Sequence, residues 1–351
     1  MKGKETTILT DRQTDRQTDR QTDRQTDRQS NSLDLLKTLC TFLIVGSHLL
    51  PLLPNEIFNL VYGQWFFRFC VPVFFISSGY FFEGMKDRSK IIYIKRILYL
   101  YFISEILYSP FIIKEYFEGS ISAFGAIKVV ILGYGHLWYL AALLYSLVIW
   151  QVIRKIKLKL KTGILIFLVT VLLFIGAFFD EYYRFMNNST IYSIGKVIDK
   201  MGSTRSAVFM GLPLALIGRS IYLHKGYHTL SKRYLWVGVA ISSALSLLEL
   251  EIIVSHNSIG YIPTCDLTFF NWVPAVFLFI IGLNTTNNIS KEKLRTLRKT
   301  DDGVYIIHPF IRNVIGYISD TTMYLTRFGI VLVISITISF TFLKLKQIIK
   351  S

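Results

Sequence analysis

Long apolar stretches separated by short polar connections make up most of the chain from residue 32 onward. A helix that crosses a bilayer needs roughly 20 mostly apolar residues. The pattern predicts an all-α, polytopic membrane protein with about ten transmembrane helices. We place them at residues 33–53, 58–82, 91–113, 136–153, 163–179, 206–223, 234–254, 267–283, 304–319 and 326–343. A shorter run, 121–132, is expected to be an interfacial helix or the start of the fourth span.

Lysine and arginine gather in every second connection between these spans, and the other connections contain few of them. Cytoplasmic loops carry such an excess, so this alternation predicts that both termini and every basic loop lie in the cytoplasm. The formal net charge of +16 is therefore mainly a sign of topology. With 52% hydrophobic and only 18% charged residues, the chain has no large soluble surface on which to bind nucleic acid.

The first 31 residues differ from the rest, because residues 11–29 repeat Asp-Arg-Gln-Thr without an apolar residue. We predict two parts: a disordered cytoplasmic tail over 1–31 and a membrane-embedded domain over 32–351. The repeat can be encoded by the tetranucleotide GACA. Such a tract near the start codon would shift the reading frame when a unit is gained or lost, which leads to the hypothesis of phase-variable expression.

The first span carries a polar stripe. Lys37, Thr41 and His48 lie on one line of the helix, with Asp34 close to it. Lys37 could instead extend to the membrane surface while His48 lies at the opposite interface. Their alignment on one face favours an internal polar path, and ionisable groups within spans are functional candidates by default.

Other polar residues within or beside the spans allow more than one interpretation. Arg68 is equally compatible with a functional role and with a role in helix packing. Arg205 could be an ordinary charge at the membrane surface. His136 and Trp138 are predicted interfacial anchors. Glu249 and Glu251 are not predicted to form an acid–base dyad, because carboxylates two residues apart do not share a helix face. One of them could pair with Arg68 or Arg205, and at least one is expected to be solvated at the membrane surface. His308 precedes Pro309 and could be structural. The three cysteines, Cys40, Cys70 and Cys265, are interpreted as small apolar residues.

Four features together resemble the acyltransferase family 3 membrane proteins, which O-acylate cell-surface carbohydrates. They are the basic residue and histidine of the first span; the RF-VP-FF--SGY segment at 68–80 with the basic stretch through Arg96; the HLWYL segment at 136–140 with the TR---F-G-P----G segment at 204–218; and the late pair Tyr305 and His308. The first-span basic residue is lysine here, where arginine is commoner in the family.

The resemblance implies an integral-membrane O-acyltransferase of the bacterial inner (cytoplasmic) membrane. It would move an acyl group, acetyl by family habit, from cytoplasmic acyl-CoA to a hydroxyl of a surface glycan such as lipopolysaccharide, capsule or exopolysaccharide. No permanently bound cofactor or metal is implied, and acetyl-CoA is the donor substrate. His48 and Lys37 would be catalytic. The implied acyl-CoA or substrate-binding residues are Asp34, Arg68, Arg96, Trp138, Arg205, Tyr305 and His308.

Three alternatives remain at this stage. Buried charges also line the paths of glycolipid or polysaccharide transporters and flippases. A lipid-sugar glycosyltransferase would be expected to have carboxylates in its first outer loop, where this chain has Glu56 alone, and a folded outer domain. A purely structural membrane scaffold would leave the alignment of Lys37 and His48 unexplained. The sequence does not reveal the oligomeric state.

Overall fold

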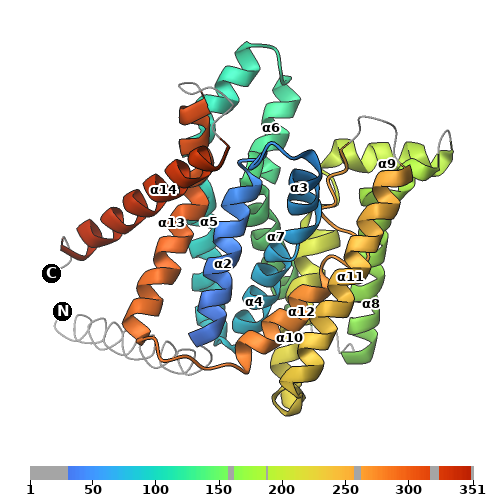
Figure 1. Ribbon diagram of the computed structural model, residues 1–351, viewed down its shortest axis with the longest axis vertical. Helices are drawn as coiled ribbons and strands as arrows, with labels where there is room; N and C mark the ends of the chain where they lie inside the picture. The colour runs from blue at the N-terminus through green and yellow to red at the C-terminus, as the bar shows by residue number, and fades with distance from the viewer. Residues whose placement is uncertain (1–30, 157–161, 187–188, 257–261, 317–323, 349–351) are drawn as a thin grey trace, which may run out of the picture.

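The computed structural model describes residues 31–156, 162–186, 189–256, 262–316 and 324–348, and within these ranges all regular structure is helical. Most helices run side by side along one direction, while α9 lies across one end of the bundle and α14 runs obliquely at its side (Figure 1). In order the elements are α2 (Asn31–Ser47), α3 (Glu56–Val61), η1 (Tyr62–Phe66), α4 (Cys70–Gly84), α5 (Asp87–Phe117), α6 (Ala123–Leu132), η2 (Gly135–Leu137), α7 (Trp138–Lys155), α8 (Thr162–Asp180), η3 (Tyr182–Phe185), α9 (Thr190–Met201), η4 (Ala207–Gly211), α10 (Leu212–Leu223), η5 (Lys225–Thr229), α11 (Lys232–His256), α12 (Val273–Leu283), α13 (Lys291–Gly316) and α14 (Tyr324–Ile348).

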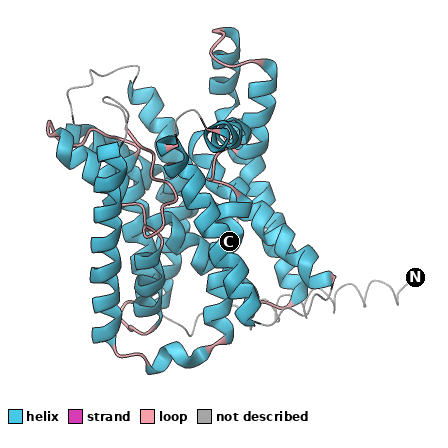
Figure 2. Ribbon diagram, turned by 90° about the vertical axis from the view of Figure 1, so that its right-hand side faces the viewer, coloured by secondary structure: helices cyan, strands magenta, loops and turns pink. Residues whose placement is uncertain are grey.

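Six helical segments are long and apolar enough to cross a membrane: Glu56–Gly84, Asp87–Phe117, Gly135–Lys155, Gly163–Asp180, Lys232–His256 and Leu325–Leu345. Three shorter apolar helices accompany them, Ala123–Leu132, Ala207–Leu223 and Val273–Leu283. The view in Figure 2 shows the same all-helical bundle from the side. The prediction of an all-α chain with several apolar helices is therefore confirmed.

The structure corrects several predicted boundaries. Helix α12 begins only at Val273, so the prediction of a helix from residue 267 was wrong for its first part. Pro274 at the start of α12 and the carboxylates that bind the preceding backbone explain the late start. Helix α13 begins at Lys291, so the basic connection before residue 304 is helical, and α9 forms within a connection expected to be a loop.

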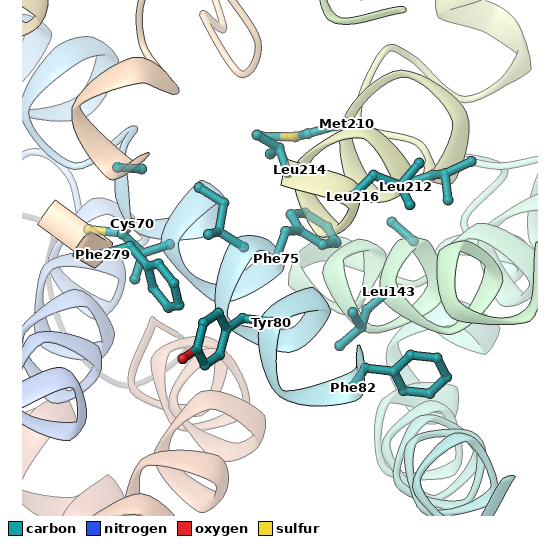
Figure 3. Packing of buried hydrophobic residues seen from close by; sticks show 14 of the residues in the cluster. Cys70, Phe75, Tyr80, Phe82, Leu143, Met210, Leu212, Leu214, Leu216 and Phe279 are labelled. Atoms are coloured by element: carbon teal, nitrogen blue, oxygen red, sulfur yellow. The ribbon is translucent and has the colours of Figure 1, made fainter. Parts of the chain in front are cut away.

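The core is built around α4, which packs most extensively against α10. Side chains of α4 reach several neighbours: Tyr80 lies beside Phe279 of α12, and Phe75 points toward α10 (Figure 3). The two backbones touch at glycines. A Cβ atom on Gly79 would overlap the carbonyl of Ala215, and one on Gly218 would overlap the carbonyl of Ile76. Close helix contact through small residues is typical of membrane bundles.

Candidate active site

Three histidines from distant parts of the chain meet inside the bundle. The ring centre of His48 lies 5.3 Å from that of His308 and 6.2 Å from that of His136, and the rings of His136 and His308 are 5.6 Å apart. His48 directly follows the end of α2, His136 belongs to η2 and His308 to α13. We call these three residues the histidine cluster. Imidazole is the side chain most often used as a general base, so this cluster is the candidate active site.

The tautomer of His308 is fixed by the backbone of its own helix. Its Nδ1 lies 2.8 Å from the carbonyl oxygen of Val304, which can only accept a hydrogen bond. Nδ1 therefore carries the proton, and Nε2 is left with a lone pair in the neutral ring. This Nε2 is buried and has no hydrogen-bond partner among the residues that the structure describes.

Tyr108 of α5 supports His308 from the other side of α13. Its hydroxyl donates to the carbonyl of Ile306 over 2.7 Å and accepts from the backbone N–H of Phe310 over 2.9 Å. In an undisturbed helix the Ile306 carbonyl and the Phe310 N–H would bond each other, and here the Tyr108 hydroxyl bridges them. The neighbouring Pro309 has no N–H to contribute. A side chain inserted into the ladder fixes the local bend of α13 at the residue that presents the imidazole.

His136 is held by aromatic side chains. The rings of Tyr108 and Tyr305 each lie 5.1 Å from its ring, and the Tyr305 hydroxyl donates to its carbonyl oxygen over 2.6 Å. Only 5% of His136 is exposed, and within the described ranges its buried Nε2 has no hydrogen-bond partner. The prediction that His136 anchors the protein at a membrane interface was wrong. It belongs to the histidine cluster because the tight turn at Gly133 (φ +97°), where a Cβ would strike the backbone of Leu137, directs η2 inward.

Lys37 occupies the other end of the polar stripe on α2. Its Nζ lies 5.0 Å from the centre of the Phe81 ring, so it contacts the SGYFF segment of α4. Around this end lie further charged groups, of which Asp34 pairs with Arg298 over 3.7 Å. Thr38, one residue after Lys37, donates to Asp301 over 2.5 Å. The stripe therefore joins a charged region to the histidine cluster.

Arg96 lies in this charged region and not at the histidines. Its side chain is 70% exposed and pairs with Asp302 over 3.7 Å, a residue of α13 whose side chain is 60% exposed. Sequence reasoning singled out neither Asp301 nor Asp302. Their position near the start of the late Tyr305–His308 segment was the available signal, but acidic residues at a predicted span boundary are common.

Arg68 and Arg205 converge on one carboxylate that sequence reasoning missed. Asp266 binds Arg68 through Oδ1 and lies 3.0 Å from Nε of Arg205 through Oδ2. Arg68 also binds Gln64, and the guanidinium of Arg205 lies 5.9 Å from the Trp138 ring centre. The neighbouring negative charge raises the pKa of Arg205 above its ordinary value. We call Arg68, Asp266 and Arg205 the arginine–aspartate group.

Both arginines lie beside a π-helical turn. η1 ends two residues before Arg68, and η4 begins two residues after Arg205. Such wide turns shift the side chains that follow or precede them and are frequent at functional sites. Here they allow residues from two separate spans to reach the same carboxylate.

Asp266 lies in an irregular loop that three buried carboxylates hold in place. Glu249 accepts hydrogen bonds from Tyr182, Thr268 and the backbone N–H groups of residues 269 and 270, over 2.7 to 2.9 Å. Glu181 accepts from the backbone of Thr264 and Cys265, and Asp180 from the backbone of Leu267. The prediction that one of Glu249 and Glu251 pairs with Arg68 or Arg205 was wrong for Glu249, because its carboxylate binds this loop. Glu251 is exposed. Buried carboxylates require such donors, and this loop supplies them.

Arg312 is a further cation at the site that sequence reasoning missed. It lies one turn after His308 on α13, and its Nη1 donates to the carbonyl oxygen of His48 over 3.3 Å. No carboxylate in the described part of the chain forms an ion pair with it. Arg312, Arg68 and Arg205 all lie near enough to act on the charge of His48. The spacing of four from His308 was the available signal, since such residues share a helix face.

No group of three or more His, Cys, Asp or Glu side chains in the described ranges is arranged to hold a metal ion. The site thus consists of imidazoles and guanidinium groups that belong to a bundle of apolar helices. Arginines beside a histidine provide a base together with donors for a developing negative charge, an arrangement suited to acyl transfer.

Comparison with known proteins identifies the family. The described residues form a bundle of largely apolar helices, and residues 30–344 match the family Acyl_transf_3, described as an acyltransferase domain. The chain therefore belongs to acyltransferase family 3, as its motifs indicated. A curated protein of Enterococcus faecalis named amino-acid racemase is 25% identical over 354 residues, which cover 91% of this chain and 46% of that protein. The chain thus spans about half the length of the curated relative it matches, and no solved structure matches it.

Proposed function

We propose that this membrane acyltransferase transfers an acetyl group from cytoplasmic acetyl-CoA to a hydroxyl group of a bacterial surface glycan. The observation that carries the proposal is the histidine cluster at one end of the α2 stripe, with Lys37 at the other end. Transfer of an acyl group to a hydroxyl needs a base or an acyl carrier, and His48 supplies either function. It is the half-buried member of the cluster, whereas His136 and His308 are buried.

The surrounding groups have complementary roles in this proposal. Lys37, Asp34 and Arg96 lie in the charged region where the donor's phosphates would bind, because lysine and arginine are the usual phosphate partners. Arg68 and Arg205 would contact acceptor anions or the oxyanion that forms during transfer. Trp138 would stack against a sugar ring, and Tyr305 and His308 would shape the reaction centre.

The proposal includes a topology of ten passes with both termini in the cytoplasm of a bacterial cell, and residence in its inner membrane. The alternation of basic connections supports it. In this arrangement the Lys37 end of the stripe faces the cytoplasm, where acyl-CoA is made, and the histidine cluster lies toward the outer side. The membrane domain would therefore pass the acyl group from one side of the bilayer to the other.

The test uses purified full-length protein in lipid vesicles with acetyl-CoA labelled in the acetyl group and lipopolysaccharide or capsular glycan as acceptor. We expect label in the glycan, lost in His48→Ala and retained in His256→Ala, whose histidine is exposed at the end of α11. Label that moves to no glycan, while lipid-linked glycan crosses the bilayer, would instead identify a flippase.

The repeat at residues 11–29 adds a proposal about expression. A slipping tetranucleotide tract would switch the gene on and off, a form of control suited to enzymes that alter the cell surface. Sequencing the tract from many single colonies tests this. A tract of constant length, or one with mixed codons, would contradict it.

A further inference from the structure

The geometry of the histidine cluster assigns a role to His308 within the proposed reaction. We propose that His308 is the positioning residue that sets the tautomer of His48, so that His48 presents a lone pair to the acceptor hydroxyl. The inference rests on the proposed function and deepens it. It commits His48 to the role of general base.

The hydrogen bond between His308 and the backbone has a fixed direction. Nδ1 of His308 must donate to Val304, because a carbonyl oxygen only accepts. Nε2 is then a buried acceptor in a residue that is 0% exposed, and no group in the described part of the chain donates to it. An unpaired buried acceptor is costly, so a donor from the cluster is needed to satisfy it.

Of the two neighbouring imidazoles, that of His48 lies closer to His308. The ring centres of His48 and His308 are 5.3 Å apart, a separation at which a ring N–H of His48 can reach Nε2 of His308. Catalytic hydrogen bonds are often long or misaligned before substrate binds and tighten in the complex. The ring of His136 is more distant from His308, at 5.6 Å, and stands nearly edge-on to it.

In the described part of the chain, the histidine cluster lacks the carboxylate that usually orients a catalytic histidine. A catalytic histidine is generally held in one tautomer by a carboxylate. In the described part of the chain no carboxylate faces this cluster, and the neutral Nε2 of His308 takes that place. The other titratable or charged groups that face His48 are His136 of η2, Arg68 between η1 and α4, Arg205 before η4, and Arg312 of α13.

The reaction then balances as a single displacement. The acceptor oxygen attacks the thioester carbonyl carbon, a carbon–oxygen bond forms, and the carbon–sulfur bond breaks. The hydroxyl proton moves to the lone-pair nitrogen of His48 and afterwards to the departing thiolate, which restores neutral His48. His308 keeps its own proton throughout and accepts the hydrogen bond from the other ring nitrogen of His48.

Two substitutions separate this role from a structural one. In H308N the amide nitrogen can still donate to Val304, but no acceptor remains at the position of Nε2. In H308Q the amide oxygen can occupy that position and accept from His48. We expect kcat to fall about 100-fold or more in H308N, with KM for acetyl-CoA little changed, and to be at least about tenfold higher in H308Q than in H308N. His256→Asn, an exposed histidine changed in the same way, is the control.

Equal kcat values for H308N and H308Q, or a kcat of H308N near that of the wild type, would overturn the inference. The proposed function would still stand as long as the wild-type protein transfers the label. A wild-type protein that transfers nothing contradicts the proposed function instead. A second measurement needs no variant: nitrogen-15 NMR of histidine-labelled protein in lipid, with His308 assigned through its link to Pro309. We expect the neutral Nδ1–H form of His308 at neutral pH. An Nε2–H or doubly protonated ring would contradict the assignment.

Discussion

Asp266 forms an ion pair with Arg205 over 3.0 Å, and the other oxygen of the same carboxylate binds Arg68. One negative charge therefore holds two guanidinium groups from separate spans. The pair also ties an irregular loop to the helices that carry the family's motifs. The carboxylate is thus both a counter-ion and a mechanical link.

Replacing Asp266 should destabilise the protein. Asp266→Asn leaves two partly buried guanidinium groups without their counter-ion, which costs about 3 kcal/mol in the free energy of unfolding. The exposed pair Lys114–Glu118 offers a control, since Glu118→Gln should cost about 1 kcal/mol or less. Thermal unfolding in the same detergent measures both. Equal losses would show that Asp266 does not link the two arginines.

Glu249 and Glu251 provide a matched pair on one helix. Glu249 accepts four hydrogen bonds, three from the loop and one from Tyr182 of η3, so Glu249→Gln turns an amide N–H toward groups that themselves donate. We expect a loss of about 2 kcal/mol in stability and a marked loss of transfer activity. Glu251→Gln, at an exposed position, should change neither property. Thermal unfolding and label transfer measured on the two variants decide the matter.

The glycines of the α4–α10 contact should tolerate no larger residue. Gly79→Ala places a methyl group in the carbonyl of Ala215, and neither backbone can move away without separating the helices. We expect little folded protein by size-exclusion chromatography. In contrast, Gly329→Ala, on α14 where no atom lies close, should be neutral or slightly stabilising. A well-folded, active Gly79→Ala variant would contradict the contact.

Lys37 should act on the donor through its charge. Lys37→Met keeps the length of the side chain and its contact with Phe81 but removes the positive charge. We expect KM for acetyl-CoA to rise roughly tenfold, the loss of one charge-assisted interaction. Lys37→Arg should recover most of this loss, because it restores the charge. Initial rates at varied donor concentration test the prediction, and an unchanged KM in Lys37→Met would refute it.

The repeat should be dispensable for chemistry. Deleting residues 11–29 in frame removes no described residue of the site and no apolar residue. We therefore expect wild-type label transfer from the shortened protein in vesicles. A large loss of kcat at equal protein concentration would give the tail a direct part in the reaction.

The sequence predicted the helical bundle well because apolar length is a local property. Lys37 lies on α2 and His48 directly follows its end, so their alignment could be read from spacing. Asp266 could not be found in this way. Its role depends on Arg68 and Arg205, which come from other spans, and on a loop that replaces the first part of a predicted helix.

The histidine cluster also could not be predicted from local sequence patterns. His136 looked like an interfacial residue because it opens a span, and only the turn at Gly133 directs it inward. Arg312 drew no attention because one arginine near a span end is unremarkable. Its importance arises from contact with the carbonyl of His48, which no local pattern encodes.

The glycine contact between α4 and α10 also bears on motion. Two helices whose backbones touch cannot slide or separate without losing that contact, so they move as one rigid unit. Arg68 and Arg205, at the ends of this unit, keep their spacing while substrates come and go. In the proposed reaction, the adjustments that admit and release the acceptor would then come from outside this pair, for example from α2, α5 and α13, the helices that position His48, Tyr108 and His308.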